Sequence, residues 1–167
     1  MGEQFGAVVS WLPYDLHPEY PPEGVPRTEH AATSSAQRMF EANGFVYNPP
    51  ADRRSNSRAA LRLAELARDQ GRFDEVHRRL MDAYWDAGLD IGDHRVLAEL
   101  ATESGVEGVD ELLAGDRYLD RVLASTEEAR SLGISGIPAF LLGRRLLVLG
   151  AHPRDTFERA FRQLENG

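Results

Sequence analysis

The 167-residue sequence contains no cysteine. This absence excludes structural disulfide bonds, thiolate metal sites and any nucleophilic or redox-active thiol within the chain. We therefore expect no catalytic residue for thiol chemistry among these 167 residues.

The chain also lacks an excess of positive charge, since 27 Asp and Glu residues outnumber 19 Lys and Arg residues and the formal net charge is −8. Basic pairs such as Arg53-Arg54 and Arg78-Arg79 are mixed with acidic residues, a pattern typical of solvated helix faces. Because a nucleic-acid partner requires a basic surface, we predict that the chain binds no nucleic acid.

Long apolar runs are missing as well. No window approaches the length of a membrane-spanning helix, and residues 1–6 have neither the basic nor the apolar region of a secretory signal. The sequence thus predicts a soluble, cytoplasmic protein with no membrane partner. Its five histidines lie far apart without paired-ligand spacing, so no metal site is expected.

What is present suffices for a folded domain, because 42% of the residues are hydrophobic. The apolar, β-forming run at 7–12 predicts a buried strand that Pro13 ends. The segment from Pro13 to Pro26 is rich in proline and glycine and predicts a loop.

The middle of the chain is predicted to be helical. Apolar residues recur at the helical period, and glycines such as Gly71, Gly88 and Gly105 are typical helix stops. Candidate N-caps are Asn56 or Ser57, Asp74 and Asp93. These signals predict helices near 29–43, 57–71, 74–88, 93–105, 110–114 and 116–133.

The pattern changes after Gly133. Two apolar runs, 139–142 and 146–149, flank Gly143-Arg-Arg145 and predict a hairpin of two buried strands. Pro153 is well suited to be the first residue of a final helix, in which Phe157, Phe161 and Leu164 share one face.

The run Gly133-Ile-Ser-Gly-Ile-Pro-Ala-Phe140 resembles the cis-proline loop of thioredoxin-like domains. Four further segments support this in the same order along the chain: 11–24 with Trp11-Leu-Pro-Tyr, Ser55-Asn-Ser-Arg58, the stretch from Phe73 to Asp93, and Gly150-Ala151. Together they resemble the DsbA-like thioredoxin superfamily, and within it the branch of FrnE-type oxidoreductases and 2-hydroxychromene-2-carboxylate isomerases.

The resemblance implies an α/β fold, in which a thioredoxin-like domain carries a large all-helical insertion. We expect a partial thioredoxin-like domain at 1–27 and 134–167, and a helical insertion domain at 28–133. Family members begin with a strand and a helix that carries a Cys-x-x-Cys motif or a serine variant. This unit is missing here, which we interpret as a truncation.

In the family's sheet, the missing strand would separate strand 7–12 from strand 139–142. Both would then present unpaired edges, and such edges favour pairing with another chain. We therefore expect a homo-oligomer that forms through exposed strand edges.

The resemblance assigns substrate binding to Gly136, Ile137 and Pro138, with a cis Ile137–Pro138 bond whose neighbouring main chain pairs with an extended peptide or glutathione. The alternative is a trans proline that begins an edge strand. Trp11 and Pro13 lie in the segment that leads away from the predicted strand, and we include them in the substrate site. Asn56 is expected near the glutathione site or, alternatively, as a simple helix cap.

Function follows from the family. Complete FrnE-like relatives are thiol–disulfide oxidoreductases, but this chain lacks the redox cysteines and is expected to be inactive alone. Its expected ligands are a peptide, a thiol or glutathione as co-substrate, with no other cofactor. Two alternatives remain open: a glutathione-dependent isomerase of the 2-hydroxychromene-2-carboxylate type, and a non-catalytic peptide-binding module.

Overall fold

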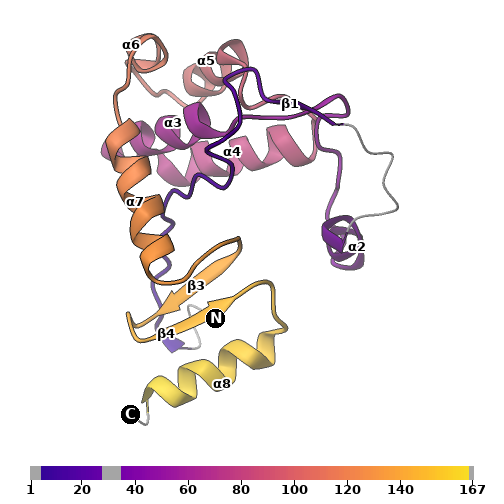
Figure 1. Cartoon of the computed structure of the whole chain (residues 1–167), viewed down its shortest axis with the longest axis vertical. Helices are drawn as coiled ribbons and strands as arrows, with labels where there is room; N and C mark the ends of the chain where they lie inside the picture. Colours follow the sequence, from indigo (N-terminus) through magenta and orange to yellow (C-terminus); the bar gives the residue numbers. More distant parts are fainter. Residues whose placement is uncertain (1–4, 28–34, 166–167) are drawn as a thin grey trace. The chain divides into compact units, whose positions relative to one another are not determined.

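The computed structural model describes residues 5–27 and 35–165, which form a mixed α/β structure (Figure 1). Seven helices are assigned among these residues: α2 (Ser35–Ala42), α3 (Arg58–Asp69), α4 (Phe73–Trp85), α5 (His94–Glu103), α6 (Val109–Ala114), α7 (Leu119–Ser131) and α8 (Arg154–Glu165). The strands are β1 (Val25–Pro26), β2 (Arg53–Arg54), β3 (Ala139–Leu142) and β4 (Leu146–Leu149).

The chain divides into two compact units. One holds the described residues of Met1–Leu16 together with those of Ala124–Gly167, and the other holds those of His17–Leu123. The helix α7 begins in the second unit and ends in the first. The domain limits expected from the sequence, 1–27 with 134–167 and 28–133, stay a proposal.

The unit at 17–123 is built around helices α3 to α6. The helix α3 packs against α4, α5 and α6, and its side chains Leu63, Leu66 and Ala67 are almost completely buried. Val76 from α4, Leu97 from α5 and Leu112 from α6 complete this core. The apolar stripe seen in the sequence thus faces inward, which explains why the helical period predicted these elements well.

A buried arginine stabilises the connection between α6 and α7. The Arg62 guanidinium, on α3, donates hydrogen bonds to the main-chain carbonyls of Leu112, Gly115 and Arg117. Burial lowers the pKa of Arg62 from its ordinary value. Because these carbonyls lie in the last turn of α6 and just after it, Arg62 satisfies acceptors that the helix itself leaves open.

The other unit contains the predicted hairpin. The strands β3 and β4 pair antiparallel, with Ala139 opposite Leu149 and Leu142 opposite Leu146. The Phe140 ring meets the Phe157 ring of α8 edge-on, with centroids 4.8 Å apart, and Figure 1 shows α8 beside the hairpin. The strands are half-buried rather than buried as predicted, because β3 and β4 form a sheet of only two strands among the described residues.

The predicted buried strand at 7–12 is wrong. Residues 7–12 form no strand, and Val8 and Val9 are 95% and 69% exposed. The run has the composition of a strand, but a strand also needs a hydrogen-bonding neighbour, and no described residue supplies one to Val8 or Val9. The composition of the segment therefore indicated a preference for the strand conformation, but it could not show whether a neighbouring strand is present.

Two helix starts also differ from the prediction. The cap of α4 is Arg72 rather than Asp74, because the Val76 N–H already bonds to the Arg72 carbonyl. Asp74 instead lies in the first turn, where an acidic side chain favours the helix dipole. Similarly, α8 begins at Arg154, one residue after Pro153.

The remaining elements agree with the prediction or differ from it only slightly. Asp93 caps α5 as predicted, since its side chain accepts a hydrogen bond from the Arg95 N–H. The pair β1–β2, with Val25 opposite Arg54, was not predicted, because each strand has only two residues. Of the predicted helix at 29–43, residues 29–34 lie outside the described residues, and α2 covers the rest to Ala42.

Candidate functional site

The loop that the sequence singles out begins where α7 ends. Gly133 has a φ of 82°, and its N–H bonds to the Arg130 carbonyl while the Ile134 N–H bonds to the Ala129 carbonyl. This pair of bonds is the Schellman motif, which requires a left-handed residue and so favours glycine. The sequence Gly133-Ile134 thus ends α7 and starts the loop at a fixed point.

The loop then runs through Ser135 and Gly136 to the Ile137–Pro138 peptide bond, which is cis. The Pro138 carbonyl accepts a hydrogen bond from the Gly150 N–H at 2.8 Å, which fixes the loop to the end of the hairpin. The side chain of Ile137 is 60% exposed. Among the described residues, none hydrogen-bonds to the main chain of Gly136 or Ile137.

The segment Pro13–Asp15 lies against α7 just before this loop. Ser125 donates a hydrogen bond to the Pro13 carbonyl at 2.7 Å, and the Asp15 N–H donates to the Thr126 hydroxyl at 2.9 Å. The Tyr14 hydroxyl donates to the Ile134 carbonyl, 3.3 Å away. The structure therefore brings the segment after Trp11 together with the loop at 133–138 in one compact unit.

The predicted site residues differ in exposure. Pro13 is buried, whereas Trp11 is 51% exposed. Sequence reasoning did not assign a role to Tyr14, which holds the segment to Ile134, or to Ser125, which holds it to α7. Tyr14 lies within the motif at 11–24, but its contact spans 120 positions and no local signal marks it; Ser125 belongs to no motif.

Asn56 belongs to the other unit, where its side chain is held by main-chain groups. Its amide nitrogen donates to the carbonyls of Tyr20 at 2.8 Å and Pro21 at 3.2 Å. Its side-chain oxygen accepts from the Arg58 N–H at 3.0 Å, at the start of α3. The N-cap of α3 is Ser57, whose side chain makes no cap hydrogen bond, and Asn56, one residue earlier, anchors the preceding loop to the start of the helix. The prediction of a ligand contact at Asn56 stays a prediction.

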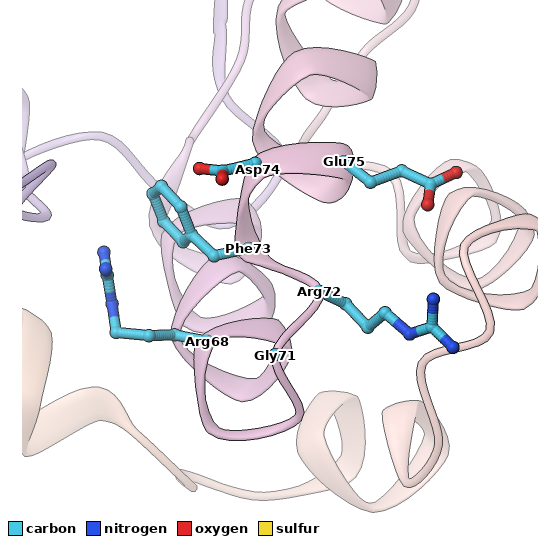
Figure 2. Close-up of a pocket in the computed structure, with 6 residues that line it drawn as sticks. All are labelled: Arg68, Gly71, Arg72, Phe73, Asp74 and Glu75. Carbon is cyan, nitrogen blue, oxygen red and sulfur yellow. The ribbon is translucent and has the colours of Figure 1, made fainter.

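A separate surface hollow of about 450 Å³ lies at the turn between α3 and α4, in the unit at 17–123. Arg68, Gly71, Arg72, Phe73, Asp74 and Glu75 line it (Figure 2). The Arg68 guanidinium lies 3.8 Å from the centre of the Phe73 ring, which in turn stacks on His77 at 5.3 Å. Burial lowers the pKa of His77, so this ring is mainly neutral near pH 7.

This hollow has no convergent set of polar groups. Figure 2 shows Arg68 beside Phe73 on one side of the turn and Arg72 beside Glu75 on the other. The Arg68 guanidinium also donates a hydrogen bond to the Glu65 carboxylate at 3.1 Å. Within residues 5–27 and 35–165, no group of three or more His, Asp or Glu side chains is arranged to hold a metal ion, and no helix is long and apolar enough to cross a bilayer.

Comparison with known proteins gives the family of the chain. Residues 2–162 match the DsbA-like thioredoxin domain family. The chain is 26% identical over 160 residues to the uncharacterized protein YwbO of Bacillus subtilis strain 168, covering 91% of this chain and 80% of that protein.

Among solved structures, the crystal structure of the probable DsbA oxidoreductase SCO1869 from Streptomyces coelicolor superposes with a TM-score of 0.77 and 27% identity. The alignment covers 90% of this chain and 72% of that one. The chain therefore belongs to the DsbA-like thioredoxin domain family, and it has the α/β fold with a helical insertion that the sequence predicted.

Proposed function

We propose that this chain is the polypeptide-binding part of a DsbA-type, FrnE-like thiol–disulfide oxidoreductase. The observation that carries the proposal is the loop Gly136–Pro138, in which Ile137 is 60% exposed and the main-chain groups of Gly136 and Ile137 have no hydrogen-bond partner among the described residues. Extended polypeptides bind such groups by main-chain pairing, in the manner of an added strand.

These 167 residues do not supply the thiol that the redox step requires. Thiol–disulfide exchange needs a thiolate that attacks a disulfide sulfur, and none of the 167 residues is a cysteine. We expect the pure chain to bind an unfolded polypeptide and to leave its disulfides unchanged. In an insulin-reduction assay with glutathione as reductant, the chain should not raise the rate above that of glutathione alone. A measurable increase would contradict this part of the proposal.

Binding is tested with a fluorescent, cysteine-free peptide of apolar residues, followed by anisotropy. Successive N–H groups of a strand point to opposite sides, so two versions of the peptide are made, N-methylated at odd or at even positions. One version should bind about tenfold more weakly than the unmodified peptide, since losing one or two hydrogen bonds costs roughly 1.5 kcal/mol. Equal affinity of all three peptides would exclude strand-like pairing.

The glutathione-dependent isomerase and the purely non-catalytic binding module remain alternatives. Competition of free glutathione with the labelled peptide would favour a glutathione site. The Asn56 amide, which the isomerase reading places near glutathione, is already engaged by Tyr20 and Pro21, so the structure gives that reading no particular support.

A further inference from the structure

The helix α2 is followed by the dipeptide Asn43-Gly44, and both of these residues are exposed. The Gly44 N–H bonds to the Glu41 carbonyl at 3.1 Å. The Phe45 N–H bonds to the Phe40 carbonyl at 3.0 Å. This pair of bonds is a Schellman motif, and Gly44 has the left-handed φ of 74° that the motif uses. The end of the helix is therefore closed by two main-chain hydrogen bonds at the surface.

This dipeptide places a side-chain amide next to an unhindered main-chain nitrogen. Gly44 has no side chain to obstruct its nitrogen, and a Cβ built on it would meet nothing within 4 Å. The Asn43 amide donates a hydrogen bond to the Met39 carbonyl at 2.8 Å. Water can replace this bond because Asn43 is exposed. Rotation of the Asn43 side chain then brings its Cγ atom to the Gly44 nitrogen, in position to close a five-membered ring.

The last turn of α2 is also easy to open. The helix has eight residues, and helices of this length are marginal in water without tertiary packing. Its Phe40 ring packs on the rings of Trp85 and Tyr47, with centroids 4.9 Å and 5.6 Å apart. The helix is thus anchored through Phe40, whereas its exposed end can fray and release the Gly44 nitrogen from Glu41.

We propose that Asn43 is a site of spontaneous covalent modification, at which the side-chain amide is converted to an acid. The Gly44 nitrogen attacks the Asn43 Cγ atom, and the new N–Cγ bond closes a succinimide ring. The Cγ–Nδ2 bond breaks, and ammonia leaves with the proton that the Gly44 nitrogen has lost. Water then opens the ring: cleavage of the new N–Cγ bond gives aspartate, and cleavage of the original main-chain bond gives isoaspartate. The proposal does not depend on the peptide site at Gly136–Pro138.

The two other asparagines in the described part of the chain are built differently. Asn48 precedes Pro49, whose nitrogen carries no hydrogen and cannot form the ring. Asn56 precedes Ser57, is only 8% exposed, and its amide nitrogen is held by two main-chain carbonyls. The structure therefore selects Asn43 among these three residues.

Conversion should loosen the end of α2. Both products lack the Nδ2 group that donates to the Met39 carbonyl. Aspartate also places a negative charge at the C-terminal end of the helix, where the helix dipole disfavours it. Isoaspartate adds a carbon atom to the main chain, which moves the N–H groups of Gly44 and Phe45 away from the carbonyls that they bond. Amide protons of α2 should therefore exchange faster in the converted chain.

Mass spectrometry of the full chain, incubated in the folded state at physiological temperature, tests the site. Trypsin releases a peptide from Met39 to Arg53 that contains both Asn43 and Asn48, and its fragments show which of the two has become an acid. We expect conversion at Asn43 that accelerates as the pH rises, because the Gly44 nitrogen attacks after losing its proton. Asn56 and Asn166 lie in other tryptic peptides, so each asparagine is followed separately.

Two matched variants separate ring closure from helix strain. Gly44→Ala adds a methyl group beside the attacking nitrogen and should slow conversion at least about tenfold. Gly71→Ala introduces the same left-handed alanine after α3, also in open space, and should leave the rate at Asn43 unchanged. An Asn43 that converts in urea but not in the folded chain, or an Asn56 that converts as fast as Asn43, would overturn the proposal. Unchanged hydrogen exchange of α2 after conversion would overturn its structural consequence.

Discussion

Asn56 shows how one side chain joins a loop to a helix. Its amide nitrogen donates to the carbonyls of Tyr20 and Pro21, and its side-chain oxygen accepts from the N–H of Arg58, the first residue of α3. The sequence predicted a cap at Asn56 or Ser57, and the structure has Ser57 at the N-cap; the place of the helix start could be predicted because it is a local property of four or five residues. The contacts with Tyr20 and Pro21 span 36 and 35 positions, and no local sequence pattern predicts them.

Gly24 is a second residue whose role depends on a distant contact. Its φ is +73°, and a Cβ built there would lie 2.4 Å from the Arg54 carbonyl oxygen, which belongs to the main chain of β2. Gly71 has nearly the same φ, +69°, with nothing within 4 Å of a built Cβ. Gly71 is therefore required only by its left-handed backbone conformation, whereas Gly24 is required both by its conformation and by the space that a side chain would need.

We predict that Gly24→Ala lowers the stability of the unit at 17–123 more than Gly71→Ala does. The left-handed conformation alone costs an alanine about 1 kcal/mol, and the clash at Arg54 should add roughly 1–3 kcal/mol. Urea unfolding followed by circular dichroism measures both free energies. Equal losses in the two variants would show that the β1–β2 pair can move aside at little cost.

At the scale of elements, the helices and the β3–β4 hairpin were predictable, and the strand expected at 7–12 was not. Helices α3 to α7 depend on apolar residues three and four positions apart and on caps within the same segment, and both can be read locally. The segment 7–12 depends instead on a neighbouring strand. The cis-proline loop lies between these cases: its residues formed a recognisable motif, but the hydrogen bond of Tyr14 to Ile134 could not be foreseen.

An ion-pair network links α3 to the start of α7. The Arg121 guanidinium lies 2.9 Å from one Asp69 oxygen and 3.2 Å from the buried Glu65, and the Tyr118 hydroxyl donates to Asp69 at 2.8 Å. Hydrogen bonds from Arg121 and Tyr118 lower the pKa of Asp69 below its ordinary value. The network therefore favours the ionised carboxylate in the folded chain.

This shift predicts the pH dependence of stability. Because the pKa of Asp69 is lower in the folded state, the contribution of its ion pairs to stability is fully present above the ordinary carboxyl pKa, about 4. This contribution is lost as the pH falls through the lower folded-state value. Asp69→Asn should therefore flatten the fall in the urea midpoint on acidification. Asp82→Asn removes the same charge from an ion pair within α4 and should keep the wild-type profile. Identical profiles for wild type and Asp69→Asn would contradict the prediction.

The helix α7 has a consequence for how the chain unfolds. It runs from Leu119 to Ser131 without interruption, while the boundary between the compact units falls between Leu123 and Ala124. Val122 and Thr126, on either side of that boundary, are almost completely buried. Amide protons near residues 122–126 should therefore exchange with solvent only when one unit or the other opens. Their hydrogen-exchange rates report whether the two units lose structure together or one at a time.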